Sequence, residues 1–237
     1  TATFELINGV AIEGGYAGFG EPDPDERQID LYKTILSGDL NGNDVDVNNP
    51  LDLLGEPTRS ENSYHVVTGS DTDRTAVLDG FVITDGAAGG LSYENRYGGG
   101  MYNSSGSPTV TNCTFISNSA EDRGGGIYIS YEMSRPILTN CTFIANHAIA
   151  GGGIFSYGES VVRECVFQEN SAAWGAGMWC ETTELTGCTF IFNLGGGIFI
   201  SSDTHLSNCS FTGNIGGALD AEDCDIVVTN CSFVGNV

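Results

Sequence analysis

A short acidic stretch is the part of this sequence whose residue types and spacing best suit metal binding. Oxygen-bearing side chains crowd around Gly42, which allows a tight turn. They are Asp39, Asn41, Asn43, Asp44 and Asp46. Alternating oxygen ligands resemble the start of an EF-hand loop, but the glycine comes too early and the distal Glu is missing. We predict a Ca²⁺ site of another kind with these five residues as ligands; the alternative is that Asp and Asn only form turns here.

The sequence shows no clear set of catalytic residues. A calcium-dependent polysaccharide lyase needs a basic side chain beside clustered carboxylates, and Lys33 is the only lysine. Arg123, Arg135 and Arg163 are expected in turns of separate coils, where they could share a face, but nothing places them near clustered Asp residues. The three histidines, His65, His147 and His205, are scattered along the chain. We therefore assign no catalytic residue and no organic cofactor, and the sequence favours a protein that is not an enzyme.

Aromatic residues are candidates for stacking on sugar rings. Several follow or precede glycine-rich segments, where they would form an outward strip: Trp174, Trp179, Tyr97, Tyr128, Tyr131 and Tyr157. The alternative is that these residues continue the alternation of a strand, with some of them buried.

The charge balance excludes whole classes of partner. The chain has 8 basic and 31 acidic residues, which gives a net charge of −23. Such a surface repels nucleic acid and anionic membranes. No apolar run approaches the roughly 18 residues of a membrane-spanning helix, and no basic-then-apolar leader opens the chain, so we expect any signal peptide to have been removed.

Two short phrases alternate through the second half of the chain and predict its architecture. One is glycine-rich and begins at Gly98, Gly124, Gly151, Gly175, Gly195 and Gly216. The other resembles Asn-Cys-Thr-Phe-x-x-Asn and ends at Asn118, Asn146, Asn170, Asn193, Asn214 and Asn236. Repeats of about 20–27 residues with short strands bury a continuous core only when they are stacked. The final Asn of each phrase should then form a ladder of hydrogen-bonded amides along the stack.

The sequence therefore predicts an all-β protein, a right-handed parallel β-helix (β-solenoid) of about eight coils. We expect a single domain over residues 1–237, with irregular coils and long loops in 1–97 and regular coils in 98–237. Six cysteines share one repeat position: Cys113, Cys141, Cys165, Cys188, Cys209 and Cys231. In stacked coils their parallel Cβ atoms lie about 4.8 Å apart, wider than the roughly 3.8 Å of a disulfide. We expect free inward thiols, while Cys180 and Cys224 lie outside this register.

The two phrases also carry a family resemblance. The paired Gly-Gly-x-Ile and Phe-x-x-Asn motifs, as at Phe115/Asn118 and Phe143/Asn146, resemble polymorphic outer membrane protein repeats. The whole chain resembles secreted bacterial right-handed parallel β-helix proteins of the pectate-lyase-like superfamily. The resemblance implies a bacterial protein that is extracellular or on the cell surface, more often adhesive or structural than enzymatic.

Two functions remain open at this stage. The first is an extracellular structural or adhesive module that associates with itself end to end into filaments, because strand edges at an uncapped end invite pairing. The alternative is a carbohydrate-active β-helix that binds or cleaves polysaccharide. The expected partners are accordingly further copies of the chain, or polysaccharides or proteins of a cell surface, and neither nucleic acid nor membrane.

Overall fold

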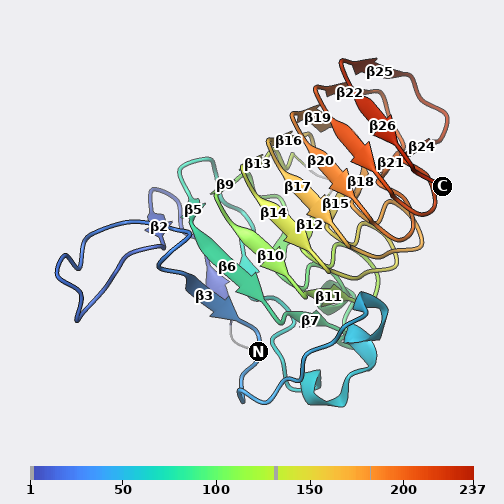
Figure 1. Cartoon of the computed structure of the whole chain (residues 1–237). Helices are drawn as coiled ribbons and strands as arrows, with labels where there is room; N and C mark the ends of the chain where they lie inside the picture. Colours follow the sequence, from blue (N-terminus) through green and yellow to red (C-terminus); the bar gives the residue numbers. More distant parts are fainter. Residues whose placement is uncertain (1–2, 131–132, 182) are drawn as a thin grey trace.

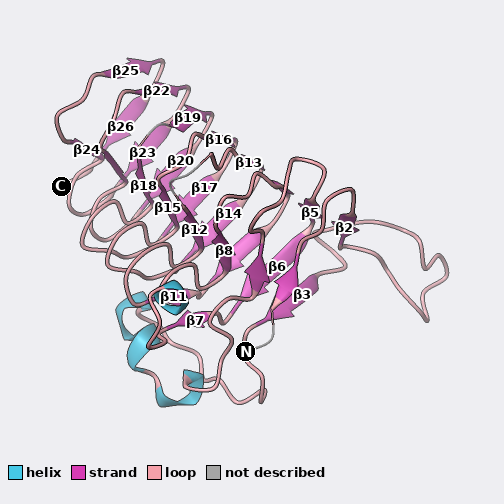
Figure 2. Cartoon of the chain, turned by 180° about the vertical axis from the view of Figure 1, so that it is seen from behind, coloured by secondary structure: helices cyan, strands magenta, loops and turns pink. Residues whose placement is uncertain are grey.

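The chain winds into a stack of β-coils, seen from two opposite sides in Figures 1 and 2. The computed structural model describes residues 3–130, 133–181 and 183–237. Within these ranges, three sheets contain eight strands each, and successive strands of a sheet pair in parallel. The all-β parallel β-solenoid predicted from the repeats is therefore confirmed.

Each coil contributes one strand to each sheet. The first sheet contains β1 (Phe4–Glu5), β4 (Val67–Thr68), β8 (Met101–Asn103), β12 (Ile127–Ile129), β15 (Ile154–Ser156), β18 (Met178–Cys180), β21 (Ile198–Ile200) and β24 (Leu219–Ala221). The second contains β2 (Ala11–Glu13), β5 (Val77–Asp79), β9 (Thr109–Thr111), β13 (Ile137–Thr139), β16 (Ser160–Arg163), β19 (Thr183–Thr186), β22 (Thr204–Ser207) and β25 (Ile226–Thr229). The third contains β3 (Thr34–Ser37), β6 (Phe81–Thr84), β10 (Thr114–Ile116), β14 (Thr142–Ile144), β17 (Val166–Gln168), β20 (Thr189–Ile191), β23 (Ser210–Thr212) and β26 (Ser232–Val234).

The first coils carry the long connections. β2 and β3 are joined by the blue loop that projects from the stack in Figure 1. β3 and β4 are joined by a segment with two 3-10 helices, η1 (Pro50–Gly55) and η2 (Pro57–Arg59). η1 packs near β11 (Ser119–Ala120), which pairs with β7 (Ala87–Ala88), and η3 (Glu94–Arg96) precedes β8. No helix in the described ranges is long and apolar enough to cross a membrane.

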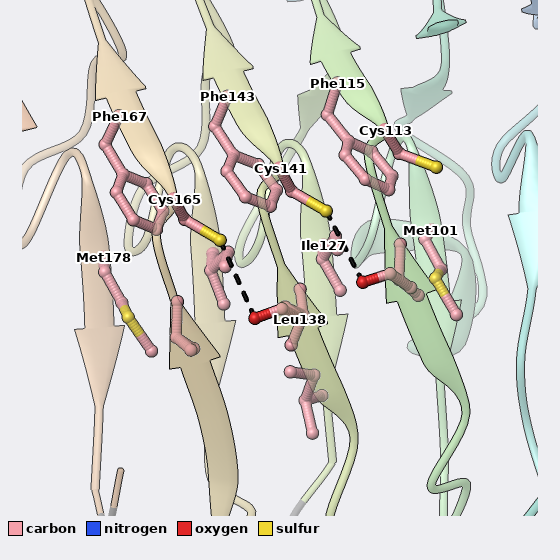
Figure 3. Close-up of a cluster of buried hydrophobic side chains, with 14 of the residues drawn as sticks. Met101, Cys113, Phe115, Ile127, Leu138, Cys141, Phe143, Cys165, Phe167 and Met178 are labelled. Atoms are coloured by element: carbon pink, nitrogen blue, oxygen red, sulfur yellow. Dashed lines mark hydrogen bonds between the residues drawn. The ribbon is translucent and has the colours of Figure 1, made fainter. Parts of the chain in front are cut away.

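The core is a stack of identical side chains one coil apart. Phe115, Phe143 and Phe167 lie in register in the third sheet, with ring centroids 5.1 and 4.9 Å apart and planes within 7°. Figure 3 shows these rings beside Cys113, Cys141 and Cys165. All eight cysteines are free thiols in this structure. Cys141 Sγ donates to Val110 O at 3.6 Å, so the thiols pack as small apolar groups with a weak donor.

The amide ladder expected at the ends of the Asn-Cys-Thr-Phe phrases is present. The Asn170 side chain is fully buried and makes four hydrogen bonds. Its Nδ2 donates to Asn193 Oδ1 at 3.0 Å and to Phe143 O at 2.9 Å, and its Oδ1 accepts from the backbone N–H and Nδ2 of Asn146, both at 3.0 Å. These bonds satisfy a polar corner that would otherwise be costly to bury.

Candidate functional site: an aromatic groove and an acidic loop

Two rows of side chains lie against each other along the first sheet. One row consists of the residues directly before the glycine phrases, joined by parallel backbone bridges: Tyr97, Arg123, Ala150 and Trp174. The other consists of the central residues of β8, β12, β15 and β18: Tyr102, Tyr128, Phe155 and Trp179. On β12, the flanking Ile127 and Ile129 belong to the main core while Tyr128 belongs to a separate aromatic cluster. The alternation of each strand thus sends the aromatic side chain outward.

The first glycine of each phrase brings the two rows together. Gly124 has φ +66°, a left-handed conformation that favours glycine. A Cβ on Gly124 would lie 2.3 Å from Ile127 O and 2.8 Å from Tyr128 Cα. Only a residue without a side chain allows this tight fold, which places Arg123 beside the aromatic row.

The aromatic row is continuous over several coils. The ring centroids of Tyr128 and Phe155 are 5.8 Å apart, and those of Phe155 and Trp179 are 4.3 Å apart, with planes within 15° in both pairs. Tyr157 meets Phe155 and Trp179 edge to face, at 4.8 and 5.1 Å. Tyr97 stacks on Tyr128 at 4.8 Å. Stacked and edge-to-face contacts are the favoured geometries of such rings and make this surface rigid.

Arg123 lies among these rings. Its guanidinium carbon is 5.0 Å from the centroid of Phe155, 5.2 Å from Tyr157 and 5.7 Å from Tyr97. Within the described residues, no carboxylate forms an ion pair with Arg123. The neighbouring Asp122 is instead paired with Arg96, at 3.1 Å. The guanidinium is thus held by cation–π contacts, and its N–H groups can donate hydrogen bonds to another partner.

The two rows border a groove. One hollow of about 380 Å³ is continued by a second, and the two share Tyr93, Arg123 and Tyr157. We call this surface the aromatic groove and define it by Tyr93, Tyr97, Arg123, Tyr128, Phe155, Tyr157, Trp174 and Trp179. Trp174 is 54% exposed, whereas Phe155 is 2% exposed. The groove therefore has a rigid floor and an accessible aromatic wall.

Tyr97 and Tyr128 are neutral hydrogen-bonding groups at ordinary pH. Burial raises the pKa of Tyr128 to about 12. Burial and a side-chain hydrogen bond with Tyr93 raise the pKa of Tyr97 further. Both phenols keep their protons far above neutrality.

The sequence-based prediction of an aromatic strip agrees with this geometry in part. Tyr97, Tyr128, Tyr157, Trp174 and Trp179 all line the groove, and the alternative also holds, because Tyr97 and Tyr128 are largely buried. Tyr131 lies outside the described residues. The sequence reasoning missed Tyr93, Phe155 and the role of Arg123, although Phe155 and Arg123 each stand at a repeat position that also holds a groove aromatic.

The other basic residues and the histidines do not join the groove. Arg163 ends β16 in the second sheet and pairs with Glu184 (3.1 Å), whereas Arg135 lies in the loop before β13 and pairs with Glu159 (2.9 Å). They do not share a face with Arg123. The three histidines occupy different coils and form no common cluster in the described part of the chain. The ring of His65 lies against Tyr102 with the planes tilted by 31°, His147 contacts Ser171, and His205 lies on β22.

The acidic loop, residues 39–46, follows β3. Asp39 Oδ1 accepts the backbone N–H groups of Asn41, Gly42 and Asn43 at 2.7–3.3 Å, and its Oδ2 accepts that of Asp44 at 3.1 Å. Burial alone would raise the pKa of Asp39, but these four donors lower it. The turn interpretation is thus correct for Asp39, whose carboxylate organises the loop.

Of the three carboxylates among the predicted metal ligands, the structure brings together two. Asp39 and Asp44 lie close to each other and to Glu61, which the sequence reasoning missed. Asp46 is exposed and lies outside this carboxylate group, and Asn41 and Asn43 also have exposed side chains. Burial raises the pKa of Asp44, against the opposing effects of a hydrogen bond from Asn62 and the charge of Arg59. Only Glu61, 17 positions after Asp44, could not have been found from local spacing.

Comparison with known proteins supports the fold and adds its handedness. A family model for a right handed beta helix region matches residues 78–184, a range that contains the whole aromatic groove. The parallel β-helix is therefore right-handed. Comparisons with curated proteins and with solved structures found no match.

Proposed function

We propose that this protein is an extracellular adhesive module that binds a neutral polysaccharide along the aromatic groove. The observation that carries the proposal is the cage of Tyr97, Phe155 and Tyr157 around Arg123, beside the exposed ring of Trp174. Aromatic rings can cover the apolar faces of sugars, and apolar burial contributes about 25 cal/mol per Å². The guanidinium donates hydrogen bonds to hydroxyl oxygens, which fixes the sugar's orientation.

The shape of the groove suits an extended chain. Its two rows run along the stack, with equivalent residues repeated from coil to coil. A polymer with a repeating sugar unit could therefore make similar contacts at successive coils. The net charge of −23 repels polyanions, which favours a neutral polymer.

The groove supports binding better than cleavage. Most glycoside hydrolases use two carboxyl groups that flank the bond to be broken. Among the described residues that line the two hollows, Asp122 is the single carboxylate, and it is paired with Arg96. Glycan recognition is thus the chemistry that these side chains favour.

Affinity gel electrophoresis tests this proposal. A gel containing a soluble neutral glucan should retard the protein, and the retardation should be lost in Trp174→Ala and Trp179→Ala. Phe19→Ala is the matched control, because Phe19 is fully exposed on the loop before β3. Equal retardation of all three variants would contradict the proposal, and so would retardation by a uronic-acid polymer alone.

End-to-end association is the second candidate, favoured by the exposed apolar residues of the β24–β26 coil. Phe233 is 48% exposed and Val228 is 43% exposed, while their partners one coil earlier, Phe211 and Leu206, are 0% and 1% exposed. Docking of a second copy on this surface would cover them. Light scattering and negative-stain microscopy test it: Phe233→Asp should abolish any filaments, and Phe19→Asp should not. Monomers at all concentrations would contradict it.

A further inference from the structure

Three carboxylates from two separate segments meet beside the start of the third sheet. Asp39 and Asp44 belong to the acidic loop, and Glu61 follows η2. One oxygen of each lies within 4.8 Å of the others. Because Ca²⁺–oxygen distances are about 2.3–2.6 Å, two ligands on opposite sides of one ion are about 5 Å apart. A single ion can therefore reach all three carboxylates.

Buried oxygens at this place lack partners. Asp44 Oδ1, Glu61 Oε1 and Asn62 Oδ1 are all buried and accept no hydrogen bond from the described residues. The Asp44 side chain is 10% exposed and Asn62 is 2% exposed. Buried acceptors without partners are rare in folded proteins and call for a specific explanation. The buried Nε of Arg59, which pairs with Asp44 through Nη1, also lacks a partner, but the three oxygens are acceptors that a cation could satisfy.

The orientation of Asn62 is fixed by its donors. Its Nδ2 donates to Asp44 Oδ2 at 2.7 Å and to Asp85 O at 2.8 Å. The opposite orientation of the amide would set oxygen against oxygen. Asn62 Oδ1 is therefore an acceptor held next to the Asp44 carboxylate.

The local charges do not balance without a further cation. Arg59 Nη1 lies 3.4 Å from Asp44 and 3.3 Å from Asp85, and Arg59 is the only cation in ion pairs with this group within the described residues. Its Nη2 is already used by Gly86 O and Ser117 O. Asp44 and Asp85 thus share one guanidinium, while Asp39 and Glu61, which lie close to Asp44, form no ion pair among the described residues. Buried charges need compensation of this kind from partners or metals.

We propose that Asp39, Asp44 and Glu61 bind one Ca²⁺ ion, with Asn62 Oδ1 as a further ligand. The donor set consists of oxygens only, as a hard cation requires, and several carboxylates with irregular geometry suit Ca²⁺ better than Mg²⁺. Asp39 Oδ2 accepts a single N–H and keeps a lone pair for the ion. The ion would fasten the acidic loop to the segment after η2 and so close the long connection between β3 and β4. This site is independent of the aromatic groove.

Isothermal titration of the chelator-treated full chain with CaCl₂ tests the site. The expected Kd is about 10⁻⁴–10⁻³ M, the range of extracellular calcium modules. Asp44→Asn and Glu61→Gln should weaken binding by about tenfold or more. Asp30→Asn is the matched control, because Asp30 is exposed and lies outside the group, and its affinity should be unchanged. Ca²⁺ should also slow proteolysis of the segment between β3 and β4 in the unmodified protein and in Asp30→Asn.

Several results would overturn the proposal. One is the absence of binding and of protection at Ca²⁺ concentrations about tenfold above the expected range. Another is an equal loss of affinity in Asp30→Asn, and a third is tighter binding of Mg²⁺ than of Ca²⁺. If circular dichroism shows that Asp44→Asn does not fold, Glu61→Gln decides the question, since Glu61 makes no hydrogen bond through its buried Oε1.

Discussion

The guanidinium of Arg123 lies 5.0 Å from the ring centroid of Phe155, a residue of the next coil along the stack. Arg123 directly precedes Gly124, and Phe155 is the central residue of β15. The contact therefore joins the two rows of the aromatic groove across neighbouring coils. It exists because Gly124 folds the chain back so closely that no side chain fits there.

Replacing Arg123 by lysine should destabilise the protein although the charge is kept. Lysine cannot present a flat guanidinium to the rings of Tyr97, Phe155 and Tyr157. We expect Arg123→Lys to lower the free energy of unfolding by about 1–2 kcal/mol, the scale of partly buried cation–π contacts. Urea denaturation followed by tryptophan fluorescence measures this loss.

Arg163→Lys is the matched control for this substitution. Arg163 is about half exposed and pairs with Glu184 at 3.1 Å, so its replacement should cost less than about 0.5 kcal/mol. Equal losses in the two variants would show that the aromatic contacts of Arg123 contribute nothing to stability.

Replacing Asn170 by aspartate should be among the most damaging single changes in the chain. The amide Nδ2 donates to Asn193 Oδ1 and Phe143 O, and a carboxylate would place negative oxygens against these acceptors in a fully buried corner. We expect a loss of about 3–5 kcal/mol at pH 7, as for an uncompensated buried charge. The midpoint of urea unfolding at constant m-value reports it.

Asn140→Asp provides the comparison for the amide ladder. Asn140 also donates to an asparagine one coil earlier, Asn112, at 2.7 Å, but this contact is exposed. Aspartate tolerates the left-handed backbone there (φ +53°), so the expected loss is less than about 1 kcal/mol. If Asn170→Asp and Asn140→Asp unfolded at the same urea concentration, the buried amide ladder would contribute no more to stability than the exposed contact.

The regular part of the fold could be predicted because each repeat carries the same residue types at equivalent positions. Asn112 and Asn140 both adopt a left-handed conformation directly before a cysteine, where the chain turns from the second sheet to the third. Phe143 and Asn146 then fall on the buried side, as do the residues equivalent to them in the neighbouring coils. When one pattern of turn, apolar residue and amide recurs in phase, stacking is the single way to bury it.

The candidate sites were only partly predictable because they join residues from different coils. Asp39 and Asp44 were visible in one short loop, but Glu61 reaches them from beyond two 3-10 helices. Arg123 was visible only as a charged turn residue, since its contact with Phe155 depends on how neighbouring coils are stacked. Local patterns predict the coil, whereas the lateral surface depends on exact loop lengths between coils.

Alkaline pH should destabilise the protein through the buried thiols of Cys113 and Cys141. Burial raises the pKa of Cys113 to about 12 and that of Cys141 well above its ordinary value. An unfolded thiol ionises near pH 8.5. The folded state keeps these protons while the unfolded state loses them. These thiols therefore do not change the free energy of unfolding with pH below about pH 8, and they lower it as pH rises beyond about 8.5. Urea unfolding at a series of pH values should show this decline.

Cys141→Ala should lower stability at pH 7 but make its pH dependence shallower. Between pH 9.5 and 10.5, the slope should fall by about 1.4 kcal/mol per pH unit, the contribution of one thiol ionised only when unfolded. Val162→Ala is the control, because Val162 is equally buried in the same core and does not titrate. It should lower stability at every pH and leave the slope unchanged. A slope that Cys141→Ala does not alter would mean that this thiol ionises as readily in the folded chain as in the unfolded one.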